Sequence, residues 1–159
     1  MLAYLSMGSN IGDRAGNLRD AISRLGGLGT VVKVSSLYET EPVDVTEQPW
    51  FVNCAVALET ELDAEELLSA LLGIERQMGR VRGSDKGPRN IDIDILLFGN
   101  EVIHTPELDV PHSEMNRRRF VLEPLAEIAP EARHPVLGKS VRELLEELPA
   151  GEQKVRSIS

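Results

Sequence analysis

The eight residues IDIDILLF, at positions 91–98, place the strongest constraint on the fold. Their first half alternates strictly between isoleucine and aspartate, which is the two-residue period of a β-strand. Successive strand side chains point to opposite faces, so Asp92 and Asp94 share one face, roughly 7 Å apart along the strand. The isoleucines take the other face. The sequence therefore predicts a sheet with one apolar face and one face that carries paired carboxylates.

Hydrophobic spacing predicts the remaining elements. Strands are expected over 2–7, 31–38 and 51–58, and helices over 14–25, 64–78, 120–128 and 141–148. Helix starts are marked by Asp13, by a capping box of Asp63 with Glu66, and by a second box of Ser140 with Glu143. Gly8-Ser9-Asn10 reads as a turn, and 38–50 and 80–89 read as loops.

The order strand, helix, strand, strand, helix, strand predicts an α+β, ferredoxin-like βαββαβ sandwich with a C-terminal helical extension. In that fold both helices cover one face of an antiparallel sheet, and the other face is left for loops and ligands. The 159 residues suit a single domain over 1–159.

Composition limits the environment and the partners. The one cysteine, Cys54, excludes an intrachain disulfide and favours a reducing compartment. We find neither an apolar run of the ~20 residues that a bilayer needs nor a signal-like start, so a cytoplasmic location and no membrane contact are expected. A net charge of −9 argues against general nucleic-acid binding.

The paired aspartates follow a basic segment that contains Arg80, Arg82, Lys86 and Arg89. Two carboxylates on one strand face repel each other unless a cation lies between them, and oxygen ligands suit Mg²⁺. Arginines beside such a pair are typical of phosphoryl transfer, and a two-metal arrangement is geometrically possible. The alternative is an amphipathic strand with a solvated acidic face. No Walker phosphate loop occurs, so side chains and metal would have to hold the phosphates.

A specific resemblance adds to this interpretation. The chain contains MGSNIGDR, YETEPV, QPWFVN, GRVR, GPRNIDIDILLFGNEVI and VPHSEMNRRRFVLEPLAEIAP. In this order, over residues 1 to about 135, these segments resemble the hydroxymethyl-dihydropterin pyrophosphokinase family of folate biosynthesis. The resemblance implies transfer of pyrophosphate from ATP to the hydroxymethyl group of a reduced pterin, with release of AMP and with two Mg²⁺ ions.

The same resemblance assigns roles to individual positions. Catalysis falls to two arginines and the aspartate pair, ATP binding to these arginines and five further residues, and pterin binding to another five. The catalytic set is Arg80, Arg89, Asp92 and Asp94, with both aspartates as metal ligands. The further ATP contacts are Glu75, Arg82, Ile95, His112 and Arg118, and the pterin contacts are Thr40, Val43, Phe51, Asn53 and Phe120.

Physical reasoning supports part of this set. Phe51 and Asn53 share a strand face, so a stacking surface and an amide that both donates and accepts would meet a flat pterin together. The alternatives are core packing for Phe51 and Phe120, and a backbone-bonded amide for Asn53. His112 is expected to donate a hydrogen bond to a phosphate. Zinc is not indicated, because no other histidine has ligand spacing to it.

Two positions depart from the family pattern. The segment 83–86 lacks an aromatic residue, and Ser113 stands where a tyrosine often follows the histidine. Other functions also fit the fold: a non-catalytic ferredoxin-like ligand-sensing module, or a different ATP-dependent transferase. We expect ATP and a reduced pterin as the partners of a monomer.

Overall fold

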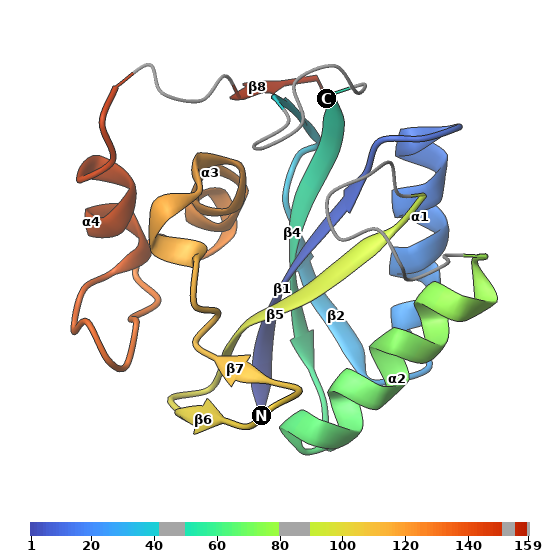
Figure 1. Cartoon of the computed structure of the whole chain (residues 1–159), viewed down its shortest axis with the longest axis horizontal. Coiled ribbons are helices and arrows are strands. Elements are labelled where there is room, and N and C mark those ends of the chain that lie inside the picture. The colour runs from blue at the N-terminus through green and yellow to red at the C-terminus, as the bar shows by residue number, and fades with distance from the viewer. Residues whose placement is uncertain (42–49, 80–89, 151–154, 159) are drawn as a thin grey trace.

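A computed structural model of the chain describes residues 1–41, 50–79, 90–150 and 155–158 (Figure 1). Strands and helices alternate in its first two-thirds, and short helices dominate the last third. In chain order the elements are β1 (Leu2–Ser9), α1 (Arg14–Leu25), β2 (Thr30–Val34), β3 (Tyr38–Thr40), β4 (Phe51–Glu59), α2 (Ala64–Gln77), β5 (Asp92–Phe98), β6 (Ile103–His104), β7 (Asp109–Val110), the 3-10 helix η1 (Met115–Arg117), α3 (Arg119–Ile128), α4 (Val141–Glu146) and β8 (Val155–Ser157).

Within the described residues, six strands form one antiparallel sheet in the order β5-β1-β4-β3-β8, and β2 also pairs with β4. Thus β5 and β8 occupy opposite edges, and β1 and β4 lie in the middle. Helices α1 and α2 lie on one side of this sheet, and α3 and α4 lie on the other (Figure 1). The structure is therefore α+β with an antiparallel sheet, as the sequence predicts.

Each face of the sheet has its own core, as the alternation in β4 predicts. Val52, Cys54 and Val56 pack with Leu67 of α2 and its neighbours on one face. Ala55 faces the other way, into a second cluster built on α3 and α4. The expectation that this second face is left to loops and ligands is wrong over the part that α3 and α4 cover, because the apolar stripe of α3 needs a surface to bury itself against.

The predicted helix starts are confirmed in atomic detail. Asp63 accepts from the Glu66 backbone N–H at 2.8 Å, and the Glu66 carboxylate accepts from Asp63 N–H at 2.9 Å. Ser140 and Glu143 form the same reciprocal pair. Such caps satisfy backbone donors that a helix cannot satisfy itself, and each contributes about 1 kcal/mol.

Strand limits differ from the prediction in three places. The strand predicted over 31–38 divides into β2 and β3, because at Ser35 the side-chain hydroxyl accepts from Ala55 N–H at 2.8 Å in place of a backbone carbonyl. Strand β3 ends at Thr40 and so extends into the segment 38–50 that was predicted as a loop. Strand β1 continues through Gly8 to Ser9, and strand β8 was not predicted. Among the described residues, no helix is both long and apolar enough to span a membrane.

Candidate active site

Three strands bring distant parts of the sequence into one row across the sheet. Gly8 of β1 is paired with Asp92 of β5 on one side and with Asn53 of β4 on the other. Paired residues present their side chains on the same face. Neighbouring strands lie about 4.8 Å apart, so the backbones of Asp92 and Asn53 are about 10 Å apart. A carboxylate and an amide thus flank a glycine on the face opposite to that of α1 and α2.

Gly8 makes this row possible. A Cβ atom at this position would lie 2.5 Å from Asn53 Nδ2 and 3.4 Å from Phe51 Cδ1. The first distance is far below van der Waals contact, so any side chain at Gly8 would displace the amide. Sequence reasoning treated Gly8 as a turn residue. The available signal was a glycine that directly continues an apolar strand pattern, which often marks a close approach.

The amide of Asn53 is buried and held in place. Its side-chain oxygen accepts a hydrogen bond from Thr40 Oγ1 at 2.5 Å, and Nδ2 lies 3.4 Å from the Met7 carbonyl oxygen. Phe51, two residues earlier, is half-buried and shares the same face. Three of the predicted pterin contacts, Thr40, Phe51 and Asn53, therefore lie together at the start of β4.

Asp92 and Asp94 are both partly exposed, whereas the strand between them is fixed from behind. The Glu75 carboxylate, only 1% exposed, accepts from the Ile93 backbone N–H at 2.8 Å. Because β5 is the edge strand, this bond satisfies a backbone donor that has no strand partner there. The bond directs Glu75 to the backbone of β5, and its predicted contact with ATP stays a prediction.

His112 lies beside the aspartates in a hollow of about 280 Å³ that Asp94, Ile95 and Ser113 also line. Its Nδ1 accepts from the Glu114 backbone N–H at 3.1 Å, so the neutral ring carries its proton on Nε2. The ring can therefore donate through Nε2, and its donation to a phosphate stays a prediction.

Burial lowers the pKa of His112 below its ordinary value, and the positive charge of Arg118 lowers it further. The carboxylates of Glu114, Asp92 and Asp109 oppose this shift. The ring is therefore neutral at pH 7. Arg118, just before α3, has its guanidinium carbon 5.6 Å from the centre of the Phe120 ring, which orients these two predicted site residues together.

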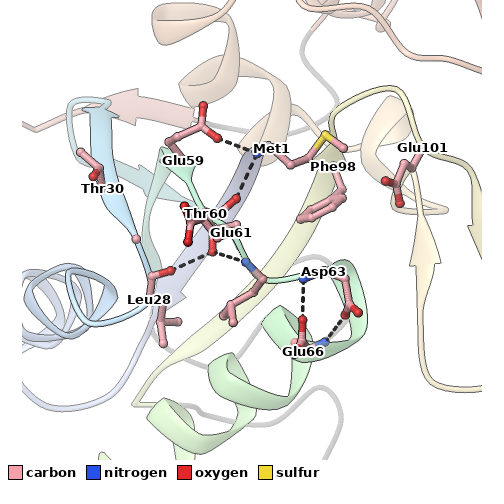
Figure 2. A pocket seen from close by; sticks show the side chains of 12 residues that line it. Met1, Leu28, Thr30, Glu59, Thr60, Glu61, Asp63, Glu66, Phe98 and Glu101 are labelled. Carbon is pink, nitrogen blue, oxygen red and sulfur yellow. Dashed lines mark hydrogen bonds and ion pairs between the residues drawn. The ribbon is translucent and has the colours of Figure 1, made fainter.

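A second, larger hollow of about 930 Å³ lies at the other end of β1 and is shown in Figure 2. There the Met1 amine forms an ion pair with Glu59 at 2.6 Å and donates to the Thr60 carbonyl at 3.0 Å. The remaining charges on its lining are carboxylates: Glu61, Asp63, Glu66 and Glu101. Like charges repel a polyphosphate, so this hollow is not a candidate site for a nucleotide.

Several predicted residues cannot be placed. Val43, Arg80, Arg82 and Arg89 lie outside the described residues, together with the rest of the predicted 80–89 loop. In the part of the chain that the structure does describe, no three His, Cys, Asp or Glu side chains gather as a metal-binding group. Of the described residues at β5, the aspartate pair offers the carboxylate oxygens that a metal would need.

These observations define a class: an α+β domain whose sheet carries carboxylates on an edge strand and a buried amide two strands away. The chain also matches the family described as 7,8-dihydro-6-hydroxymethylpterin-pyrophosphokinase (HPPK) over residues 4–130. The chain belongs to this family.

Individual relatives agree with this placement. The chain is 50% identical over 129 residues to the 2-amino-4-hydroxy-6-hydroxymethyldihydropteridine pyrophosphokinase of Bacillus subtilis, covering 80% of this chain and 77% of that protein. Identity to the protein of the same name from Methylorubrum extorquens is 45% over 156 residues, covering 96% of this chain and 98% of that protein.

Longer proteins are similar over part of their length. The folic acid synthesis protein fol1 of Pneumocystis carinii is 41% identical over 146 residues, which are 91% of this chain and 20% of that protein. A crystal structure of Plasmodium falciparum HPPK-DHPS superposes with a TM-score of 0.75 at 19% identity, over 92% of this chain and 45% of that one. At that identity the superposition shows a shared fold. This chain thus spans only a minor part of these two proteins.

Proposed function

We propose that this chain transfers pyrophosphate from ATP to the hydroxymethyl group of 6-hydroxymethyl-7,8-dihydropterin in folate biosynthesis. The substrate hydroxyl oxygen attacks the β-phosphorus of ATP and loses its proton. The bond from that phosphorus to the bridging α–β oxygen breaks, and AMP leaves with the oxygen. The observation that carries the proposal is the row of Asp92, Gly8 and Asn53 in a chain of this family. This row places Asp92, which is assigned to the metal and phosphates, and Asn53, which is assigned to the pterin, on one face of the sheet.

The residues at β5 fit magnesium. Asp92 and Asp94 are hard oxygen donors on one strand face, and both are partly exposed, as a site that shares its ion with a substrate requires. We infer that this pair would hold the two Mg²⁺ ions that the resemblance implies. When bound, the metal neutralises charge on the phosphates and orients the reacting groups.

Side chains of the protein would bind the pterin and the phosphates. Asn53, oriented by Thr40, would read the polar edge of the pterin, and Phe51 and Phe120 would stack on its rings. His112 would donate its Nε2 proton to a phosphate oxygen, with Arg118 close by. Our assignment of Arg80, Arg82 and Arg89 to the triphosphate rests on the resemblance alone. Little covalent chemistry is required, because positioning and neutralisation lower the barrier.

The decisive assay measures AMP. Purified protein is incubated with ATP, Mg²⁺ and 6-hydroxymethyl-7,8-dihydropterin, and AMP and the pterin diphosphate are quantified by chromatography. We expect equal amounts of both products, and neither when the pterin is omitted or EDTA is added. AMP without pterin would indicate another ATP-dependent transferase. Binding of a ligand without any turnover would indicate the sensing module.

The topology of a single domain and its oligomeric state are proposed on separate grounds. The strand order, with β1 between β5 and β4 and with β2 and β3 beside β4, supports a ferredoxin-like topology in a single domain over residues 1–159. A monomer is supported by β2, which among the described residues pairs with β4 alone and so has one open edge. It carries Lys33 and a register shift between Val31 and Lys33, and charges and bulges on an open strand edge oppose pairing with another sheet. The cytoplasmic location stays a prediction from the sequence.

A further inference from the structure

Strand β8 extends the sheet at the edge opposite to the aspartates. Val155 pairs with Thr40, Arg156 with Glu39 and Ser157 with Tyr38. The strand lies at the same end of the sheet as the start of β4 (Figure 1). The family match ends at residue 130, so β8 lies outside the segment that defines the family.

Arg156 closes a ring of four residues, Arg156, Glu39, Arg14 and Trp50, which we call the Arg156 clamp. Its Nε donates to Glu39 Oε1 at 3.0 Å and its Nη2 also contacts that oxygen, while its guanidinium carbon lies 5.1 Å from the centre of the Trp50 ring. The other Glu39 oxygen is 3.3 Å from Arg14 Nη1, and the same nitrogen donates to the Trp50 carbonyl at 2.8 Å. The clamp thus joins β8, β3, α1 and the residue before β4.

Two of the four clamp residues are direct chain neighbours of pterin-side residues. Glu39 precedes Thr40, and Trp50 precedes Phe51. Because strand side chains alternate, Glu39 and Thr40 lie on opposite faces, so the clamp holds the back of the strand whose front carries Thr40. Thr40 is in turn paired with Phe51. Fixing Glu39 and Trp50 therefore fixes the backbone from which two predicted pterin contacts extend.

The electrostatics of the clamp are consistent with a persistent contact. Hydrogen bonding from Arg156 lowers the pKa of Glu39 below its ordinary value, against the effect of burial, and Arg14 adds to the lowering. The Glu39 side chain is 16% exposed, whereas that of Arg156 is 68% exposed. An isolated ion pair this exposed would contribute little. Here Glu39 is largely buried and contacts two arginines, and Arg156 also lies over the Trp50 ring.

We propose that β8, through Arg156, is a positioning element for the pterin half of the site, acting on Thr40, Phe51 and Asn53 and leaving the β5 half unaffected. The inference rests on the proposed function. Sheet order supports the selectivity, because β4 and β1 separate β3 from β5. A loosened β3 would misplace the Thr40 hydroxyl that orients the Asn53 amide, with no corresponding effect on the aspartates.

The test compares Arg156→Gln with Arg156→Lys and with a matched control, Arg142→Gln. Arg142, whose side chain is about as exposed as that of Arg156, forms an ion pair with the exposed Glu131 at the start of α4, away from β3 (Figure 1). Calorimetry gives the dissociation constants of the pterin and of a non-hydrolysable ATP analogue, and steady-state kinetics gives KM for each substrate. We expect Arg156→Gln to weaken pterin binding about fivefold and ATP binding less than twofold. Arg156→Lys should recover part of the loss, and Arg142→Gln should change neither constant.

Trp50 supplies an independent signal, because it is the only tryptophan in the chain. Its emission should shift in Arg156→Gln, because the guanidinium leaves the ring, and should not shift in Arg142→Gln. Glu39→Gln, which removes the charge between the two arginines, should reproduce the pterin-selective loss and decides the matter if Arg156→Gln does not fold.

Two outcomes would overturn the proposal. One is unchanged pterin affinity in Arg156→Gln and Glu39→Gln, which would mean that β8 covers the edge of the sheet without positioning the pterin contacts. The other is an equal loss of pterin and ATP affinity with a lowered melting temperature, which would make its role generally structural. Failure of the proposed function is separate from both, since it would appear as unmodified protein that forms no AMP in a pterin-dependent manner.

Discussion

The two halves of the candidate site use polar groups in different ways. On the β5 edge, Asp92 and Asp94 are charged and partly exposed. Around β3 and β4, Thr40 and Asn53 are neutral, buried and bonded to each other. Burying an ionised carboxylate is very costly, whereas a hydroxyl or an amide can be buried once its hydrogen bonds are made. The ionic half therefore stays open to ions and phosphate, while the neutral half is preorganised within the sheet.

Gly8 is where the two halves meet. It is paired with one residue from each half, Asp92 and Asn53, and contributes only backbone to the face between them. Substitutions in each half should therefore affect the binding of one ligand selectively, and a change at Gly8 should show to which half the centre of the row belongs.

The largest effect is expected on the ionic half. On the proposed function, Asp94→Asn should lower kcat roughly a thousandfold, about 4 kcal/mol in the barrier, because it would remove a charge that holds the metal against the phosphates. Pterin affinity measured without nucleotide should be unchanged. Asp20→Asn, which alters an exposed aspartate paired with Arg24 in α1, is the control and should keep normal turnover. Near-normal turnover of Asp94→Asn would remove the aspartates from the mechanism.

A substitution in the neutral half should affect pterin binding and leave ATP binding nearly unchanged. Asn53→Ala should weaken pterin binding by about tenfold to a hundredfold, because the polar edge of the ligand and the Thr40 hydroxyl both lose a partner. Binding of an ATP analogue should change less than twofold. Calorimetric titrations with each ligand separate the two effects. Equal losses for both ligands would contradict the division of the site.

Gly8→Ala tests the boundary between the halves. The new methyl would force the Asn53 amide aside, so we expect roughly tenfold weaker pterin binding and about 1–3 kcal/mol of lost stability. Gly73→Ala in α2 is the matched control, since its Cβ would meet only Arg76 Nη2, at 3.9 Å. That control should be neutral or stabilising by about 1 kcal/mol in urea unfolding. Losing ATP rather than pterin affinity in Gly8→Ala would assign the centre to the ionic half.

The smallest effect concerns the charge of His112. Arg118 lowers its pKa, so Arg118→Gln should raise that pKa towards 6.5, as measured by NMR titration of the ring protons. A His112→Gln spectrum assigns the signal among the three histidines. A pKa that stays the same or falls would show that Arg118 does not face the ring.

The sign of the linked stability change follows from the lowered pKa. In the unfolded chain His112 takes up a proton near pH 6.5, whereas in the folded protein it does so only at lower pH. Above pH 6.5 neither state is protonated at His112, so the residue makes no pH-dependent contribution to the free energy of unfolding. As pH falls from 6.5 to the folded pKa, stability is lost, because only the unfolded state gains the proton. Arg118→Gln should narrow this window, which urea unfolding between pH 7.5 and 5 can follow.

Much of the fold could be predicted because its signals are local. The alternation at 91–98 and 51–58 specifies two strands and their faces, and the Asp63 and Ser140 boxes specify two helix starts. The same alternation places Asp92 with Asp94, and Phe51 with Asn53, before any tertiary information is added. Each of these signals depends on neighbours within four residues, and so the sequence alone determines them.

Only the tertiary structure decided how these parts combine. Strand β3 has three residues and exists because β4 and β8 flank it, and β8 in turn depends on β3. The clash that forbids a side chain at Gly8 comes from Asn53, 45 positions away in sequence but paired with it across the sheet. The Glu75 bond to the β5 backbone likewise spans two elements. Such contacts depend on strand register and helix packing, which the hydrophobic pattern of one segment cannot specify.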